Sequence, residues 1–257
     1  MISVVIPTYK RPDLLARLLE SICQQTLLPS EVIVIDDASS MDQAYRSCID
    51  QFKSRLPALH FQSLPTNAGA PYARNTGIRQ AKGEWIALVD DDDEWLPEKL
   101  AKQWELAQKA PHAVGLIYTW THAQGVGEQA SYASRHLVRG DARRAIFSTN
   151  FIMSASVMVR KRAIEQAGLF DEALPSCQDW DMWARIFLQG YTCEVVPEVL
   201  TIYHRHGGES IGLSPRAKLG YKLFLDRHFP AIVRHTGPLN ILKKSWLYFQ
   251  VWRMSRG

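Results

Sequence analysis

The stretch Trp85-Ile86-Ala87-Leu88-Val89-Asp90-Asp91-Asp92-Asp93 passes directly from five apolar residues to four aspartates. A short apolar run of this kind predicts a strand buried in a sheet. Adjacent like charges repel, so four carboxylates at a strand end indicate that a cation or a helix N-terminus lies close by. The alternative is a solvated acidic turn whose charges favour the N-terminus of a helix beginning near Pro97.

The spacing of the four aspartates predicts the directions in which their side chains point. On a strand and its exit, Asp90 and Asp92 are expected to point to one side while Asp91 points away. Hard divalent ions such as Mg²⁺ and Mn²⁺ prefer carboxylate oxygens and commonly share their coordination sphere with substrate phosphates. The pair Asp90 and Asp92 is therefore a candidate site for one ion.

Short apolar runs alternate with amphipathic stretches around this strand. The alternation predicts an α/β fold with a central, mostly parallel sheet flanked by helices. The expected strands cover residues 3–7, 31–36, 59–63, 85–89 and 115–119, and the expected helices cover 12–25, 42–53, 70–81 and 97–110. Polar clusters at Thr8-Tyr9-Lys10-Arg11, Asp36-Asp37 and 90–93 follow strand ends, which is where open α/β sheets bind ligands.

The pattern is weaker in the second half of the chain. Residues 121–145 combine three glycines with polar residues, which predicts a loop or a short irregular hairpin. The elements expected after it are a strand at 156–160, a helix across 180–188 and short strands at 192–196 and 200–203. The C-terminal residues are expected to be helical, with a break near Thr236-Gly237-Pro238.

The length and charge of the chain limit the classes of protein to which it can belong. With 257 residues and 46% hydrophobic content, the chain is long enough for one globular domain with a small appendage. No apolar stretch approaches the roughly 18 residues that span a bilayer, and the first residues lack the features of a signal peptide, so a cytoplasmic protein is expected. The net charge is +4, but residues 211–257 hold nine Lys or Arg against Asp226 alone, a local balance of +8 that leaves −4 for the rest. A basic tail on an acidic body indicates an anionic partner surface, either phospholipid or nucleic acid.

One long motif gives the chain a family resemblance. It reads Asn67-x-Gly69-x-x-x-Ala73-Arg74-Asn75-x-Gly77-Ile78-x-x-Ala81-x-Gly83-Glu84-Trp85-Ile86-x-Leu88-Val89-Asp90-x-Asp92-Asp93. Together with Val4-Val5-Ile6-Pro7-Thr8-Tyr9 and Val34-Ile35-Asp36-Asp37-Ala38-Ser39, it closely resembles glycosyltransferase family 2, inverting nucleotide-sugar enzymes with a Rossmann-like GT-A fold. The resemblance implies a GT-A domain over residues 1–210, with a nucleotide-sugar half at 1–120 and an acceptor and catalytic half at 121–210. A basic helical extension would occupy 211–257.

The resemblance also implies a donor site at the strand ends. Pro7, Thr8, Tyr9 and Arg11 would line the nucleotide pocket, because an aromatic at a strand end offers a stacking face. Asp36 would accept a hydrogen bond from the uracil ring, the alternative being an ordinary turn or capping residue.

The same resemblance assigns residues to the phosphates and the metal. Arg74 would lie near the nucleotide and the aspartates, since its planar fork bridges carboxylates or phosphate oxygens; the alternative is a surface salt bridge. Asp90 and Asp92 match the Asp-x-Asp motif, with Asp90 and Asp91 beside the nucleotide sugar and Asp91 in the variable position. Asp92 and a histidine complete the shell of a Mn²⁺ or Mg²⁺ ion, and Asp93 caps or orients the loop. The histidine position matches His206, while His204 stands where the family usually has arginine.

A second motif, Cys177-Gln178-Asp179-Trp180-Asp181-Met182-Trp183-x-Arg185, resembles the family segment that carries the general base. Asp179 matches the catalytic aspartate, which takes the proton of the acceptor hydroxyl. Gln178 stands where the family most often has glutamate and is a candidate for acceptor contact. Trp180 is either a stacking platform for an acceptor sugar or a packing residue. For Asp181 a structural role at the helix start is favoured.

The implied reaction moves a hexose, with glucose or galactose favoured, from a UDP-sugar to a saccharide acceptor with formation of a β linkage. The expected acceptor is an undecaprenyl-diphosphate-linked sugar such as GlcNAc, in O-antigen, lipopolysaccharide or other polysaccharide assembly. The alternatives are a lipopolysaccharide core or soluble acceptor, and a non-catalytic module that binds nucleotide sugar or metal. The chain lacks a nucleic-acid recognition motif, so no nucleic-acid partner is expected.

The tail residues beyond 210 combine aromatic and basic side chains, as in Trp246-Leu247-Tyr248-Phe249-x-Val251-Trp252 with Lys243 and Lys244. Such helices are typical of peripheral membrane anchors, which favours the cytoplasmic face of the inner membrane. The alternative is a helix that packs on the catalytic domain or across a dimer interface.

Overall fold

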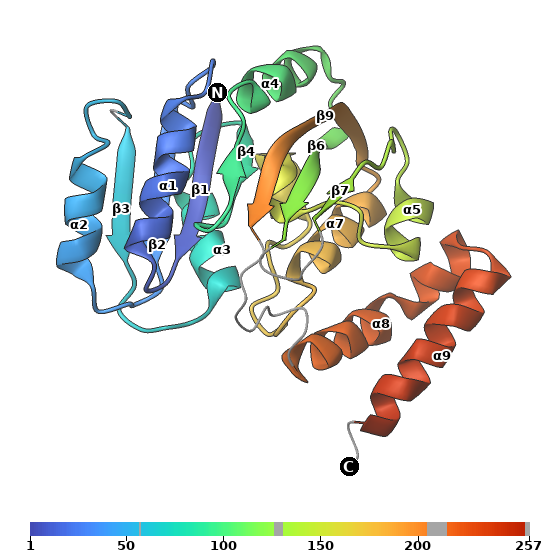
Figure 1. Cartoon of the computed structure of the whole chain (residues 1–257). Coiled ribbons are helices and arrows are strands. Elements are labelled where there is room, and N and C mark those ends of the chain that lie inside the picture. Colours follow the sequence, from blue (N-terminus) through green and yellow to red (C-terminus); the bar gives the residue numbers. More distant parts are fainter. Residues whose placement is uncertain (57, 126–130, 205–214, 255–257) are drawn as a thin grey trace.

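The computed structural model describes residues 1–56, 58–125, 131–204 and 215–254. Its sheet has nine strands in the order β3-β2-β1-β4-β8-β6-β9-β5, with β7 paired to β6 (Figure 1). The strands are β1 Ile2–Thr8, β2 Glu31–Asp36, β3 Leu59–Ser63, β4 Trp85–Leu88, β5 Glu94–Trp95, β6 Val114–Gln124, β7 Tyr132–Ser134, β8 Val157–Arg160 and β9 Thr192–His204. The predicted α/β architecture of a sheet flanked by helices is confirmed.

The first half of the sheet is parallel, which aligns its carboxyl ends. β1 lies between β2 and β4, and Thr8 at the end of β1 pairs with Asp36 at the end of β2. Alternate residues of β1 enter two cores on opposite faces: Val5 packs in one, while Val4 and Ile6 pack in the other. Among the helices that pack in these cores, α1 Pro12–Cys23, α2 Asp42–Asp50 and α4 Lys99–Lys109 lie on the Val4 face, and α3 Ala70–Gln80 lies on the Val5 face.

The second half is mixed, because β8 runs antiparallel to both β4 and β6. Of the loop or short irregular hairpin expected at 121–145, the hairpin is confirmed: the end of β6 pairs antiparallel with the short strand β7, and α5 Arg143–Ser148 begins after it. The two strands expected after residue 192 form the single strand β9. A register shift against β6 accommodates Pro197, which cannot donate a ladder hydrogen bond.

Helices α6 Lys161–Gln166 and α7 Gln178–Leu188 precede two C-terminal helices, α8 Pro215–His235 and α9 Pro238–Met254. The predicted break at 236–237 is confirmed. Phe224, Leu225 and Ile232 of α8 belong to the same core as α7, so α8 packs on the domain, and α9 runs beside it (Figure 1). Among the residues described, no helix is both long and apolar enough to cross a membrane.

Candidate active site

The aspartates form a turn at the end of β4. The backbone N–H of Asp93 donates to the carbonyl oxygen of Asp90 at 3.1 Å, which closes the turn. The strand-like alternation expected for Asp90 and Asp92 therefore does not hold, because a turn rotates successive side chains in different directions. The two carboxylates contact different arginines, from α3 and from the loop after β1.

Asp91 and Asp92 face the carboxyl end of β1. The Arg11 guanidinium forms ion pairs with Asp91 Oδ1 at 2.6 Å and Asp92 Oδ2 at 2.7 Å. The Thr8 hydroxyl donates to Asp91 Oδ2 at 2.6 Å. Burial raises the pKa of Asp91 to about 7, although Arg11 and Thr8 act to lower it. Asp91 is thus a fully buried anchor for the first loop, and the side chain of Asp92 is 16% exposed beside it.

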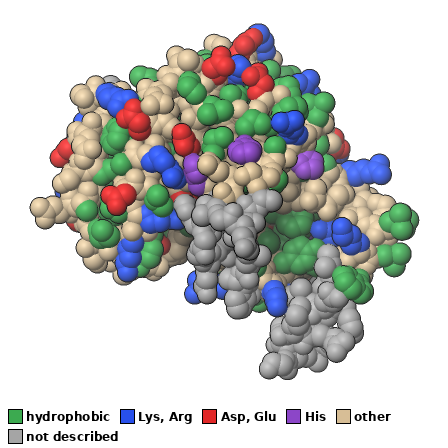
Figure 2. Space-filling view, viewed as in Figure 1, with side chains coloured by type: hydrophobic (Ala, Val, Ile, Leu, Met, Phe, Trp, Pro, Cys, Tyr) green, Lys and Arg blue, Asp and Glu red, His purple; other side chains and the backbone are tan. Residues whose placement is uncertain are grey.

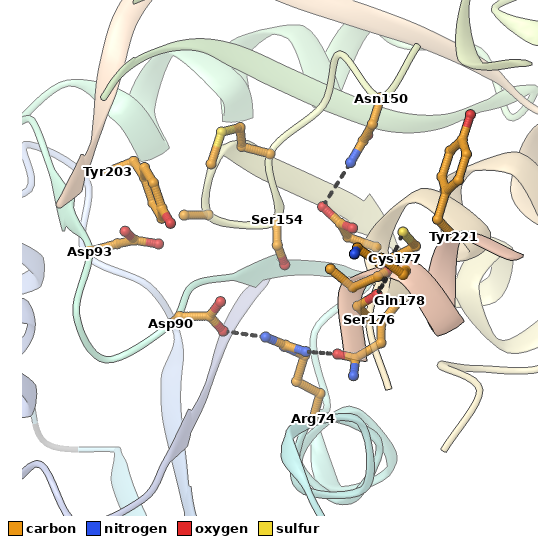
Figure 3. Close-up of a pocket in the computed structure, with 15 residues that line it drawn as sticks. Arg74, Asp90, Asp93, Asn150, Ser154, Ser176, Cys177, Gln178, Tyr203 and Tyr221 are labelled. Atoms are coloured by element: carbon orange, nitrogen blue, oxygen red, sulfur yellow. Dashed lines mark hydrogen bonds and ion pairs between the residues drawn. The ribbon is translucent and has the colours of Figure 1, made fainter. Parts of the chain in front are cut away.

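Asp90 faces the other way and pairs with a buried arginine. Arg74 from α3 donates to Asp90 Oδ1 at 2.6 Å and to the Gln178 amide oxygen at 3.2 Å (Figure 3). Burial acts to lower the Arg74 pKa, but the Asp90 carboxylate outweighs it, and the pKa is raised. Arg74 therefore connects the end of β4 to the first turn of α7, and a surface salt bridge does not describe it.

Asp93 is a buried carboxyl without a full set of partners. Its side chain accepts the backbone N–H of His204, while Oδ1 has no hydrogen-bond partner among the described atoms. Burial, together with the neighbouring aspartates, raises its pKa well above the usual range. Asp93 and Asp90 both face one cavity, with Tyr203 beside Asp93 (Figure 3).

Asp179 stands in the first turn of α7. This helix begins after Cys177, whose φ of 58° lies in the left-handed region. Asp179 Oδ1 accepts the backbone N–H of Trp180 at 2.7 Å, and Oδ2 accepts the side-chain amide of Asn150 at 3.2 Å. Burial raises the pKa of Asp179, whereas Asn150, the Trp180 N–H and Arg74 act to lower it.

One cavity of about 560 Å³ joins these groups. It brings together four of the residues predicted from the sequence, namely Arg74, Asp90, Gln178 and Asp179. The other lining residues are Asp93, Asn150, Met153, Ser154, Ala155, Ser176, Cys177, Tyr203, Ala217, Lys218 and Tyr221. Carboxylates and an arginine thus converge from α3, the turn after β4 and α7.

The other predicted donor residues lie outside this lining. Pro7 is buried in β1 opposite Ile35, and Tyr9 is 39% exposed. The Asp36 carboxylate is fully buried and accepts hydrogen bonds from Ser39 and from the Ser63 hydroxyl, the latter at 2.8 Å. These hydrogen bonds hold the Asp36 carboxylate in the turn that follows β2.

Trp180 is covered by the C-terminal helices. Its indole is 8% exposed, stacks on Phe224 with ring centroids 4.2 Å apart, and donates to the carbonyl oxygen of Ile146. Lys244 of α9 lies 4.5 Å from the ring centroid. A sugar platform at Trp180 does not fit this packing, because α8 and α9 occupy the space where a sugar would stack.

Asp181 has the structural role expected from the sequence. Its fully buried carboxylate accepts from Arg185 at 2.8 Å, Arg227 at 2.9 Å and His228 at 2.8 Å. Burial acts to raise the pKa of Asp181, but these partners outweigh it and lower the pKa to about 2. The network attaches α8 to α7 two residues after the candidate base, Asp179.

Several cavity residues had no sequence signal that identified them, among them Asn150, Lys218 and Tyr221. Asn150 lies after α5, between the irregular region expected at 121–145 and the strand expected at 156–160. Lys218 and Tyr221 lie on α8, beyond the family motifs. Only the basic and aromatic content of the tail pointed toward α8.

The proposed metal site is partly described. His206 lies outside the described residues, and His204 Nε2 lies 3.2 Å from the Glu94 carboxylate. Within 1–56, 58–125, 131–204 and 215–254, no three His, Cys, Asp or Glu side chains are arranged to hold an ion. The donor chemistry nevertheless fits a hard divalent cation, because Asp93 presents a buried carboxylate oxygen without a partner next to Asp90.

Two comparisons concern the sequence. Residues 3–168 match the family model described as "Glycosyl transferase family 2". The chain is 33% identical over 233 residues to the uncharacterized glycosyltransferase YwdF of Bacillus subtilis, covering 88% of this chain and 82% of that protein. It is 29% identical over 234 residues to WcaA of Escherichia coli, named a putative colanic acid biosynthesis glycosyl transferase, covering 89% and 81%.

Solved structures resemble the fold at lower identity. The TarS 1–349 structure of S. aureus with UDP-GlcNAc matches with a TM-score of 0.71 at 21% identity, covering 98% of this chain and 71% of that chain. The mannosyltransferase PcManGT of Pyrobaculum calidifontis, with GDP-Man and Mn²⁺, matches with a TM-score of 0.65 at 22% identity, covering 98% and 73%. The family model covers most of the chain and agrees with this GT-A architecture, and the chain belongs to glycosyltransferase family 2.

Proposed function

We propose that the protein is an inverting glycosyltransferase that moves a hexose, with glucose or galactose favoured, from a UDP-sugar to a saccharide hydroxyl. One observation carries the proposal: Asp179 lies in the same cavity as Asp90, Asp93 and Arg74. The reaction needs a general base, and it needs carboxylates that can hold a metal ion beside the diphosphate. The cavity holds a candidate for each role, which supports the proposal.

Asp179 is the proposed general base. As the acceptor oxygen forms its bond to the anomeric carbon, the bond from that carbon to the diphosphate oxygen breaks, and its electron pair leaves with UDP. The acceptor proton passes to Asp179. Attack from the face opposite the diphosphate converts an α-linked donor into a β-linked product.

Asp92 and His206 are the proposed ligands of Mn²⁺ or Mg²⁺, with the unpartnered oxygen of Asp93 as a further oxygen donor facing the cavity. When bound, such an ion acts as a Lewis acid that offsets the charge on the departing diphosphate. Arg74 supplies a fixed positive charge on the same side of the cavity. PcManGT, a protein of the same fold, was solved with Mn²⁺.

The donor nucleotide is proposed to bind along the ends of β1 and β2, at Pro7, Thr8, Tyr9, Arg11 and Asp36, with Asp90 and Asp91 beside the sugar. The parallel register places the ends of these two strands side by side, next to the aspartate turn. TarS, which shares the fold, was solved with UDP-GlcNAc. Binding of uracil at Asp36 requires the hydrogen bonds from Ser39 and Ser63 to rearrange.

The proposed acceptor is a sugar linked to a lipid diphosphate, such as undecaprenyl-diphosphate GlcNAc. Lys218 and Tyr221 of α8 line the cavity together with Gln178. The relative WcaA is named for colanic acid biosynthesis, which is also a polysaccharide assembly. A lipopolysaccharide core or a soluble saccharide is the alternative acceptor.

Peripheral attachment to the cytoplasmic face of the inner membrane is part of the proposal. One face of α9 packs on the domain through Asn240 and Lys244. The opposite face exposes Leu239, Leu242 and Trp246, at 83%, 67% and 60%. An apolar stripe on a basic tail suits insertion into an anionic lipid interface (Figure 2).

UDP release tests the enzymatic proposal. A panel of UDP-sugars is supplied with a synthetic lipid-diphosphate GlcNAc acceptor, with Mn²⁺ and then with excess EDTA. We expect release with one hexose donor, its loss with EDTA, and a β linkage in the product by proton NMR coupling. Donor binding without release from any UDP-sugar would favour the non-catalytic module, and an α-linked product would contradict inversion.

A further inference from the structure

The side-chain amide of Asn150 contacts the candidate base, Asp179, from the segment that follows α5. Its Nδ2 donates to Asp179 Oδ2 at 3.2 Å, shown by the dashed line at Asn150 in Figure 3. Asn150 also lines the cavity, so its contact with Asp179 lies at the surface that an acceptor would reach.

The chain holds Asn150 firmly although its side chain is exposed. The two residues that follow it, Phe151 and Ile152, are 4% and 1% exposed and belong to the core. The Phe151 ring makes an edge contact with Tyr118 of β6, with centroids 5.5 Å apart. These buried neighbours fix the backbone from which the amide reaches Asp179.

The two hydrogen bonds to Asp179 act in different ways. The Trp180 N–H belongs to the backbone of α7 and is present whatever the neighbouring side chains. The Asn150 amide is the side-chain donor, and an amide nitrogen can only donate, so it favours the ionised carboxylate. Two donors on two oxygens restrict rotation of the carboxylate and leave a lone pair on each oxygen for a proton.

We propose that Asn150 is a positioning residue that holds the Asp179 carboxylate in the orientation in which it accepts the proton of the acceptor hydroxyl. This inference rests on the proposed function, because it takes Asp179 as the base. Asn150 makes no contact with the donor-side carboxylates in the described structure, so it acts on the acceptor half of the reaction.

Other charged and titratable groups also face Asp179 and its cavity. They are Arg74 on α3, Asp90 and Asp93 after β4, Cys177 before α7, and Lys218 and Tyr221 on α8. None of them changes in an Asn150 variant, so a difference between variants reports the amide itself.

Carboxyl NMR tests the contact without any substrate. Protein with ¹³C-labelled aspartate carboxyls is titrated, and the Asp179 signal is assigned by its loss in Asp179→Asn. In Asn150→Ala we expect the Asp179 midpoint to rise by roughly half a pH unit or more, because the ionised form loses a hydrogen bond. The matched control is Ser148→Ala in the same segment, whose hydroxyl donates only to the Arg144 carbonyl oxygen; its midpoint should not move.

Kinetics then connect the contact to turnover. Asn150→Ala should lower kcat about tenfold at pH 6, leave the KM for the donor unchanged and recover part of the loss at pH 8, as expected for a weakened general base. Asn150→Asp replaces the hydrogen-bond donor with a carboxylate. It should shift the acid limb of the kcat profile to a higher pH than Asn150→Ala does. An unchanged Asp179 midpoint, or a kcat of Asn150→Ala equal to that of the unaltered protein, would overturn the proposal. Failure of the enzyme proposal itself appears separately, as absence of turnover in the unaltered protein.

Discussion

At the scale of residues, the four aspartates of the turn after β4 have four different environments. Asp90 pairs with Arg74, Asp91 is buried between Thr8 and Arg11, Asp92 pairs with Arg11, and Asp93 keeps an unpartnered oxygen. The sequence predicted the cluster and its position at a strand end. The different partners of the four aspartates could not be predicted, because the strand alternation assumed for these residues ends where the turn begins.

Gln178 is one of two residues at which the chain departs from the pattern it resembles, the other being His204. Its amide oxygen accepts from Arg74, and its amide nitrogen donates to the Leu174 carbonyl oxygen. Replacing it with glutamate adds a negative charge next to Asp179 in the chain. Since a nearby like charge disfavours ionisation, the pKa of Asp179 should rise in Gln178→Glu.

We therefore predict that Gln178→Glu moves the acid limb of kcat/KM upward by roughly half to one pH unit. The pH profile of UDP release measures this shift. Gln178→Ala is the control, because it removes the Arg74 contact without adding charge, and its limb should stay close to that of the unaltered protein. A downward shift in Gln178→Glu would contradict the electrostatic account.

At the scale of elements, one buried carboxylate adds to the apolar packing that attaches α8 to α7. Asp181 accepts from Arg185 of its own helix and from Arg227 and His228 of α8. The sequence predicted that Asp181 is structural, since it lies at a helix start. Its partners on α8 were not predictable, because they lie 46 and 47 residues further along the chain.

Removing this charge should destabilise the protein in a pH-dependent way. The pKa of Asp181 is depressed from 3.8 to about 2 in the folded state. Its contribution, roughly 2 kcal/mol, is therefore present above pH 3.8 and is lost as the pH falls toward 2. We predict that Asp181→Asn lowers the free energy of unfolding by about this amount at pH 6, and by less at pH 3, in urea titrations.

The control for this prediction is Asp226→Asn on α8. Its carboxylate is 37% exposed and pairs with Lys222 one turn away. Such an exposed pair contributes about 0.5 kcal/mol or less, so the two variants should differ clearly at pH 6. Equal effects of the two substitutions would show that the buried network does not attach α8 to the domain.

At the scale of the whole molecule, the strands of the parallel half of the sheet could be predicted from the sequence more readily than those of the mixed half. Buried apolar runs marked β1, β2 and β4, whose registers place their carboxyl ends together. The mixed half lacks this signal, because β5 and β7 are two and three residues long and β9 passes through Pro197. The cavity closes only through long-range packing, which brings α8 against α7.

The exposed stripe of α9 should bind anionic membranes. We predict that the double variant Leu242→Gln/Trp246→Gln binds anionic vesicles at least about tenfold more weakly, because each side chain loses apolar burial in the lipid interface. Vesicle flotation measures the bound fraction. Leu137→Gln is the control, since Leu137 is 64% exposed but lies outside α8 and α9. Equal binding of the double variant would reject α9 as the membrane contact.

The central claim is that Asp179 removes the acceptor proton. The measurement that tests it most directly is the rate of UDP release by Asp179→Asn, at saturating donor and acceptor, with the thermal unfolding midpoint as a check on folding. We predict a fall in kcat of about 10² to 10⁴, with the donor KM changed by less than about threefold. Undiminished turnover in a folded Asp179→Asn protein would contradict the account.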